Sequence, residues 1–359
     1  MEKIHTDDLT NREIIVVFNQ KGGVGKTTTA VNISVCLSLL GMRTLLIDLD
    51  SQSNATQCCG LQADCQFGSY DLLMGTATVE QASRDTNISG MRVCAADDKL
   101  AGVDLELASA ERPQFKLSEA LAKEVGIDYV VIDCPPTLGM LPINALASAT
   151  IVLIPVTPEP LSHAGLHRAW KHIMKVKSHL NNRLDKIGIL MTMVDDKDKT
   201  RSDVDRAIHA EFGTRVLPIR ISRDNAMMEA SGKNLPVVIS APNSSGTRNY
   251  LDLAELLISW KSASADGKGY ERSEDQDIVG RAMILDDIQK IRKILLPMSE
   301  HQPIIVGIDP ENPWQEPASL PRSPASFNGR HALIIAICGI GLAIAAVFAN
   351  HMMHAVNLP

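Results

Sequence analysis

A glycine-rich segment near the N-terminus carries the clearest chemical signal in this chain. It reads Gln20-Lys21-Gly22-Gly23-Val24-Gly25-Lys26-Thr27-Thr28 and lies between a β-branched run and an apolar helical pattern. Glycines let the backbone curl and direct its N–H groups at an anion, and the positive end of the following helix adds to the attraction. Lys26 is placed to neutralise the β- and γ-phosphates of a nucleotide, and the Thr27 hydroxyl is a suitable Mg²⁺ ligand. The segment therefore predicts a loop that binds a nucleoside triphosphate with Mg²⁺.

Acidic residues follow two further apolar runs. Asp48 and Asp50 come after Thr44–Ile47, and Asp133 comes directly after Tyr129–Ile132. The carboxyl ends of parallel strands meet at one edge of a sheet, so these carboxylates should face the phosphate loop. Like charges there would repel the nucleotide unless a cation lies between them. We therefore predict that Asp133 holds Mg²⁺ together with Thr27.

The elements that must position these residues are short β-branched strands alternating with helical patterns. This alternation predicts an α/β fold with a mostly parallel, twisted sheet covered by helices on both faces. The predicted domain covers residues 14–260, after a tail at 1–13. Its clearest strands are Ile14–Phe18, Thr44–Ile47, Tyr129–Ile132, Ile151–Ile154 and Ile187–Met191.

The glycine-rich loop resembles the deviant Walker A motif of the MinD/ParA family of P-loop ATPases. Gln20 stands where a strict P-loop has glycine, and Lys21 adds a second lysine. The segment 48–56 resembles the family's first switch, with Ser51 in its usual proline position. The segment 129–136 resembles its Walker B strand and following switch. The resemblance covers most of residues 14–258.

The resemblance implies roles for several residues. Lys21 would reach across a homodimer interface to the partner's ATP, and Asp50 would orient or activate the attacking water. Asp48 would shape the switch and the metal shell. Met193, within the segment 191–195, would lie at the adenine end together with Glu229 and Ala230. ATP hydrolysis would be slow and stimulated by a partner protein, which could be ParB-like.

The charge of the chain bears on nucleic-acid binding. A net charge of −7 and a pI near 5.8 leave only a local patch for contacts with DNA. In the ParA branch a Pro-Arg-Asn-x-Arg run ends at a DNA-contacting arginine, but here Ala226 takes that place in Ser222–Ala226. Nonspecific DNA binding stays open. Other basic candidates, which are more often solvated helix faces, are Arg168, Lys171, Lys175, Lys177, Lys197, Lys199 and Arg201.

The chain after the predicted ATPase domain changes composition repeatedly. Residues 278–296 have helical apolar spacing, and this amphipathic helix docks either on its own domain or on a partner. The predicted segments are a linker at 261–277, the amphipathic helix at 278–296, a proline-rich tether at 297–330, a transmembrane helix at 331–350 and a short tail at 351–359.

The transmembrane prediction depends on Ala332–Ala349, a run without charge. About 20 helical residues span the hydrocarbon core of a bilayer. Arg322 and Arg330 precede the run and no lysine or arginine follows it, which keeps the N-terminus inside.

Seven cysteines without paired spacing are typical of a reduced cytosol. We therefore expect a cytoplasmic ATPase domain anchored to the inner membrane.

A histidine pair, His163 and His167, has the four-residue spacing that places two imidazoles on one face of a helix. The sequence offers no evident third metal ligand, so we interpret it as a surface pair.

Two functional hypotheses follow. The first is a membrane-tethered ATPase that positions or segregates DNA or a protein cargo by cycling between monomer and dimer. The second is a nucleotide-gated scaffold of an envelope or conjugation machine in which turnover is unimportant. The sequence alone identifies neither the cargo nor the stimulating partner.

Overall fold

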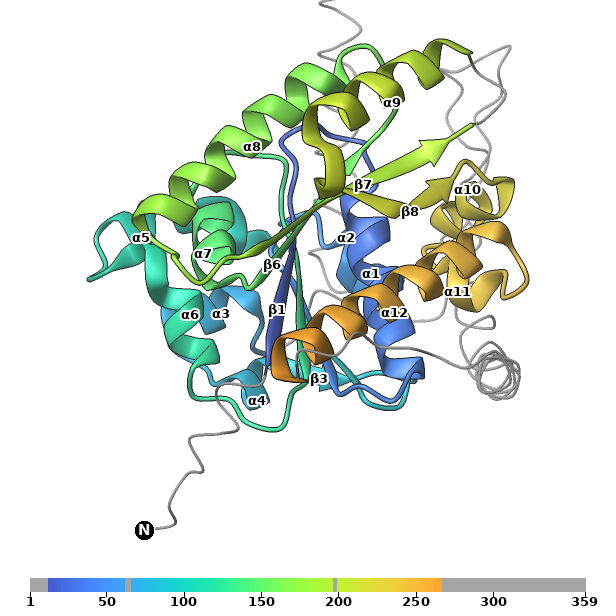
Figure 1. The fold of residues 1–359 in the computed structure, drawn as a ribbon. Helices are drawn as coiled ribbons and strands as arrows, with labels where there is room; N and C mark the ends of the chain where they lie inside the picture. Colours follow the sequence, from blue (N-terminus) through green and yellow to red (C-terminus); the bar gives the residue numbers. More distant parts are fainter. Residues whose placement is uncertain (1–11, 62–65, 196–198, 267–359) are drawn as a thin grey trace, which may run out of the picture. The chain divides into compact units, whose positions relative to one another are not determined.

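One eight-stranded sheet organises the computed structural model of the chain (Figure 1). The strand order is β3-β4-β2-β5-β1-β6-β7-β8, and every neighbouring pair is parallel except β3 with β4. The strands are β1 Glu13–Val17, β2 Thr44–Asp48, β3 Ser83–Asp85, β4 Met91–Cys94, β5 Tyr129–Asp133, β6 Ile151–Val156, β7 Lys186–Val194 and β8 Val216–Ser222.

Both faces of this sheet are buried, which explains the near-continuous apolar character of its strands. Side chains alternate between the faces, so Ile14 and Val16 belong to one core while Ile15 and Val17 belong to the other. Because β1 lies between β5 and β6, the loop after β1 emerges in the middle of the strand-end edge. This is the position where α/β sheets bind ligands.

The helices divide between the two faces. Those whose apolar residues join the core of Ile15 and Val17 are α1 Lys26–Leu39, α2 Asn54–Cys58, α10 Asn225–Gly232, α11 Val237–Ser240 and α12 Ser245–Asp266. Those on the other face are α3 Ser69–Met74, α4 Val79–Ala82, α5 Val103–Ala108, α6 Lys116–Leu121, α7 Met140–Ser148, α8 Ser162–His179 and α9 Lys199–Phe212.

The predicted fold class is confirmed for the domain, and all five predicted strands are present with small shifts at their ends. Helix α12 continues past the predicted domain boundary at 260, through Lys261 to Asp266. Lysine and alanine favour a helix, and the first glycine after Trp260 is Gly267, so α12 extends into the predicted linker.

The structure describes residues 12–61, 66–195 and 199–266. All of them belong to one compact unit, Met1–Gln302. None of the helices in these ranges combines the length and the apolar character that a bilayer crossing requires. The predicted amphipathic helix, tether and transmembrane helix at 331–350 lie outside the described residues, as does most of the N-terminal tail.

Candidate functional site

The glycine-rich loop joins β1 to α1 with open space above its backbone. Gly23 and Gly25 have φ of +71° and +85°, a region that side chains rarely adopt. A Cβ added at Gly22, Gly23 or Gly25 would meet nothing within 4 Å. Helix α1 begins at Lys26 without a side-chain cap, so its first N–H groups are available to an anion. The loop therefore has the shape and polarity of a phosphate cradle.

Lys26 is the buried cation of this cradle. Its side chain is largely enclosed, with the residue only 7% exposed, and its Nζ donates to the carbonyl of Lys21 at 3.1 Å. Burial lowers the pKa of Lys26, and the nearby carboxylate of Asp133 opposes this shift. A buried ammonium with one backbone partner retains donor capacity for a phosphate.

Asp133 ends β5 and is fully buried beside Asp48, its register neighbour on β2. Neither carboxylate oxygen of Asp133 has a hydrogen-bond donor among the described residues. Burial and the charge of Asp48 hold the pKa of Asp133 well above its usual range, while the ammonium of Lys26 opposes this shift. A buried, unsatisfied carboxylate next to a threonine hydroxyl is a pair of hard oxygen donors, which fits Mg²⁺.

Asp48 has a different environment from Asp133. Its Oδ1 accepts from the Asp50 backbone at 3.0 Å, and its Oδ2 accepts from the backbone and hydroxyl of Thr56 at 2.9 and 2.8 Å. Burial still raises the pKa of Asp48 to about 6. These hydrogen bonds fix the segment between β2 and α2, and the part of Asp48 in the metal shell stays a prediction.

Asp50 lies where the two predicted switch segments approach each other. Its Oδ1 accepts from the Gln52 backbone at 3.0 Å. It lines a cavity of about 550 Å³ together with Pro135 and Pro136. Its charge also reaches Lys26 and influences the pKa of that lysine. The carboxylate is thus near the phosphate cradle and partly accessible to water, as the predicted role of orienting a water molecule requires.

Lys21 is held by the segment that follows β6. Its Nζ contacts Glu159 Oε2 at 2.6 Å and Ser162 Oγ at 3.0 Å. Asn19 ties the loop to the same strand, because its Oδ1 accepts from the Lys21 backbone at 3.0 Å and its Nδ2 donates to the Pro155 carbonyl at 2.8 Å. The partnership with Glu159 was not anticipated from the sequence.

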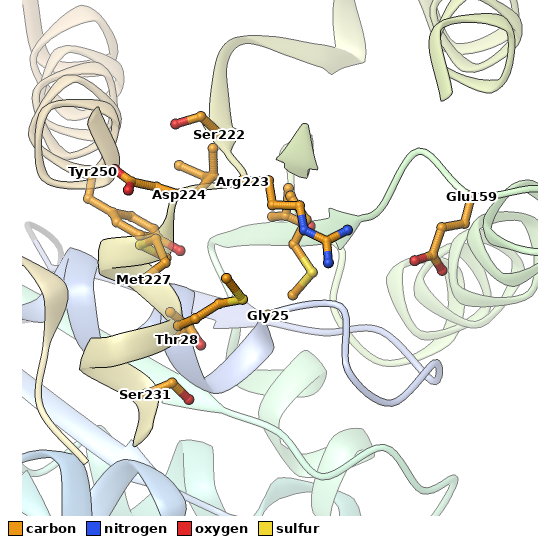
Figure 2. Close-up of a pocket in the computed structure, with 13 residues that line it drawn as sticks. Gly25, Thr28, Glu159, Ser222, Arg223, Asp224, Met227, Ser231 and Tyr250 are labelled. Carbon is orange, nitrogen blue, oxygen red and sulfur yellow. The ribbon is translucent and has the colours of Figure 1, made fainter. Parts of the chain in front are cut away.

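A cavity of about 420 Å³ adjoins the start of α1 (Figure 2). The Thr192 hydroxyl closes one side by donating to the Val24 carbonyl at 2.9 Å. The lining residues are Gly25, Thr28, Glu159, Thr192, Met193, Ile221, Ser222, Arg223, Asp224, Met227, Met228, Ser231 and Tyr250. Sulfur, aromatic and hydroxyl groups around an opening beside Thr28 suit the base and ribose of a nucleotide.

Known proteins give a consistent family assignment for this site. A family model described as an AAA domain matches residues 12–186. The chain is 38% identical over 245 residues to the sporulation initiation inhibitor protein Soj of Bacillus subtilis, with 68% of this chain and 97% of that protein covered. It is 36% identical over 250 residues to the chromosome partitioning protein ParA of Caulobacter vibrioides, covering 68% and 94%.

The chain belongs to the MinD/ParA family of P-loop ATPases. A similar solved structure is the cobyrinic acid a,c-diamide synthase of Mycobacterium smegmatis with bound ADP and magnesium. It has a TM-score of 0.62, 30% identity, and coverage of 73% of this chain and 100% of that one. As a MinD/ParA ATPase with an open cradle and an unsatisfied Asp133, this chain uses ATP and Mg²⁺ as its cofactors.

The cavity beside Thr28 is formed by residues from two segments that the MinD/ParA resemblance singles out. Met193 lines this cavity, whereas Glu229 is not among its lining residues and Ala230 is buried in the core; their place at the adenine end stays a prediction. The run Ser222–Ala226, considered as a DNA contact, contributes Ser222, Arg223 and Asp224 to the cavity wall. The sequence did not indicate that this run lines the cavity. The run lies far from the phosphate loop in the sequence and approaches it only through the pairing of β7 with β8.

Three of the other basic candidates of this MinD/ParA chain lie together on one helix at i, i+3, i+7 spacing. Arg168, Lys171 and Lys175 are exposed on α8, whereas Lys177 pairs with Asp185. Lys197 lies outside the described residues, and the side chains of Lys199 and Arg201 are not described.

Proposed function

We propose that this ATPase is a nucleotide-dependent dimerisation switch that positions or segregates a DNA or protein cargo while residues 331–350 tether it to the inner membrane. The chromosome-partitioning role in the name of the Caulobacter vibrioides relative supports the class of cargo. The tether rests on the uncharged run near the C-terminus. A ParB-like protein is a suitable stimulating partner.

The position of Lys21 carries the proposal. It lies beside the phosphate loop at the strand-end edge, and its side chain is 27% exposed. Glu159 and Ser162 hold it through long-range contacts that a competing phosphate can replace. A lysine that leaves Glu159 on dimerisation can reach a nucleotide in the facing subunit, so ATP would both complete the site and join the subunits.

Exposed apolar side chains support a subunit contact at the same edge. Leu138 follows β5 and is 59% exposed, and Leu161 follows β6 and is 77% exposed. Since β5 and β6 run parallel to β1 on either side of it, both leucines emerge at the edge that carries Lys21. Large apolar groups beside a charged site are typical of an interaction surface.

The position of each residue in the site supports a proposed role in ATP binding or hydrolysis. The backbone from Gly22 to Thr28 and the Lys26 ammonium bind phosphates, and Thr27 with Asp133 would hold Mg²⁺. Mg²⁺, when bound, supplies positive charge against the triphosphate. Asp50 orients water, and Asp48 keeps the Asp50 backbone in place. Since positioning supplies most of the catalysis, hydrolysis is slow until a partner arranges the two switches.

Imaging a fluorescent fusion with and without residues 331–359 tests the proposal in cells. We expect envelope signal for the full chain and its loss on truncation; nucleoid signal after truncation would add support for DNA affinity. Asp50→Ala should stop cargo positioning while leaving the envelope signal intact. Normal positioning by Asp50→Ala would instead favour the scaffold function, and envelope signal without residues 331–359 would contradict the tether.

A further inference from the structure

Two histidines on α8 meet a glutamate from α9. His163 and His167 lie one helical turn apart, with their ring centroids 4.7 Å from each other. Glu211, in the last turn of α9, brings its carboxylate to within 2.8 Å of His163 Nε2 and 3.0 Å of His167 Nε2. The third ligand that the sequence does not reveal is therefore present, 48 and 44 residues away in the chain.

The three donor groups are close enough to share one ion. Their nitrogen and oxygen atoms all lie within 4.8 Å of one another. A tetrahedral ion with bonds of about 2.0–2.1 Å holds its ligand atoms about 3.3–3.4 Å apart. The two His–Glu contacts of 2.8 and 3.0 Å need to open by a few tenths of an ångström, and the two imidazole nitrogens, at most 4.8 Å apart, need to settle at the same spacing. Exposed side chains on two helices can make that adjustment.

The donor set indicates the class of ion. Two imidazole nitrogens and one carboxylate oxygen favour Zn²⁺ and related transition metals over Mg²⁺ or Ca²⁺, which take oxygen ligands. All three side chains are 38–46% exposed, so the fourth position of a bound ion would be open to water or to an outside ligand. Within the described ranges, Glu211 pairs with the two imidazoles and with no lysine or arginine. Its charge is thus available to a cation.

Packing between α8 and α9 pre-organises the donors. Phe212, next to Glu211, is buried and lies 5.7 Å from the His167 ring and 5.5 Å from the Trp170 ring. This aromatic contact fixes the end of α9 against α8, so Glu211 stays opposite the histidines. Sites held on helices with packed neighbours keep their geometry better than sites on loops.

We propose that His163, His167 and Glu211 form a binding site for a divalent transition-metal ion such as Zn²⁺, separate from the nucleotide site. The ion links α8 to α9. The site also adjoins the contacts of Lys21, because His163 directly follows Ser162, whose Oγ accepts from Lys21 Nζ at 3.0 Å. Metal occupancy stiffens the helical turn that holds Lys21. The proposal does not depend on the proposed function.

Calorimetric titration of the full-length protein with Zn²⁺, in excess Mg²⁺ and under reducing conditions, tests this site. We expect His167→Asn and Glu211→Gln to lose one Zn²⁺ equivalent or to weaken its binding at least about 10-fold. His172→Asn is the matched control, since His172 lies on the same helix outside the cluster, and it should bind Zn²⁺ like the unaltered chain. Equal titrations for all four proteins would overturn the proposal.

Co²⁺ provides a second measurement that needs no variant. Co²⁺ bound by imidazole and carboxylate groups gives visible d–d bands without thiolate charge transfer. We expect this spectrum at the first equivalent. A first equivalent with strong thiolate-to-metal charge transfer would place the ion on cysteines and overturn the proposal.

Discussion

Lys26 and Asp133 are opposite buried charges at the ends of different elements, and each lacks its full set of partners. Lys26 Nζ has a backbone carbonyl at 3.1 Å, and the carboxylate of Asp133 has no hydrogen-bond donor in the described part of the chain. Both groups are therefore costly in the absence of a nucleotide and a metal ion. Stability measurements with and without ligand should report directly on their roles.

Lys26→Ala should abolish the stabilisation of the protein by MgATP, because the phosphates lose their buried cation. For the unaltered chain we expect a gain of about 2.7 kcal/mol when ATP is 100-fold above its Kd. Thermal denaturation with and without MgATP measures this gain. Lys171→Ala, on the exposed face of α8, is the control and should keep it. Full stabilisation of Lys26→Ala would contradict the assignment of the cradle.

Asp133→Asn should make the nucleotide-free protein more stable at neutral pH, by roughly 1–3 kcal/mol. Burial raises the pKa of Asp133, so the folded state holds this proton more tightly than the unfolded state does. The contribution of Asp133 to the free energy of unfolding therefore falls as pH rises above about 4, the usual pKa of the group. Asparagine has no such dependence.

Urea denaturation at pH 4 and pH 7.5 measures the difference in the free energy of unfolding between Asp133→Asn and the unaltered chain. This difference should be near zero at pH 4 and largest at pH 7.5. The same variant should lose the Mg²⁺-dependent part of ATP binding. A variant that is less stable than the unaltered chain at pH 7.5 would show that Asp133 is not a strained, unpaired charge.

At this scale the sequence predicted residues whose roles follow from local spacing and missed those defined by distant contacts. Lys26, Thr27 and Asp133 belong to motifs that carry their own structural context. Glu159 meets Lys21 across 138 positions, and no local pattern marks it. Glu211 was missed for the same physical reason, since tertiary packing alone brings it to the two histidines.

At the scale of elements, β1, its loop and the start of α8 act as one unit. Asn19 bonds the loop to β6, and Glu159 and Ser162 extend this link to Lys21. The half-exposed ion pair between Lys21 and Glu159 contributes about 0.2–1 kcal/mol. This free energy is enough to favour the position of Lys21 beside Glu159, and it is small enough for Lys21 to leave that position.

Glu159→Gln should strengthen ATP-dependent dimerisation about 2- to 5-fold, because Lys21 leaves a neutral amide more readily than a carboxylate. Sedimentation equilibrium in a nonhydrolysable ATP analogue and Mg²⁺ measures the dissociation constant. Asp185→Asn, which breaks the ion pair with Lys177 near the other end of α8, is the control and should leave it unchanged. Weaker dimerisation of Glu159→Gln would mean that the carboxylate supports the interface.

Helix α12 is fastened to α1 by the buried hydroxyls of Tyr250 and Thr29, which lie 3.2 Å apart. Tyr250→Phe leaves the Thr29 hydroxyl without this partner and should lower the free energy of unfolding by about 1 kcal/mol. Urea denaturation checks this. Tyr70→Phe removes an exposed hydroxyl bonded to Glu106, and it should lower the free energy of unfolding by less than Tyr250→Phe does. Equal losses in the two variants would contradict this account of α12.

The elements foreseen from sequence are those with long apolar runs. β1, β2, β5, β6 and β7 are β-branched and covered on both faces, so their pattern is strong. β8 contains Pro218 and Arg220 and lies at the sheet edge, where burial demands less apolar character. β3 and β4 are too short to give a periodic signal.

At the scale of the whole molecule, one edge of the sheet gathers the phosphate cradle, both switch segments, Lys21 and the exposed leucines at 138 and 161. Within one chain, Lys21 pairs with Glu159. A second subunit facing this edge would bury the leucines and give Lys21 a triphosphate partner. In this arrangement ATP would be the ligand that joins the two subunits.

The most direct test is the mass of the protein in solution with a nonhydrolysable ATP analogue and Mg²⁺, measured by sedimentation equilibrium for the unaltered chain and for Lys21→Ala. We predict a dimer for the unaltered chain, and a monomer for Lys21→Ala that still binds the analogue. An unaltered chain that stays monomeric with analogue bound, or a Lys21→Ala variant that dimerises equally well, would contradict the central claim.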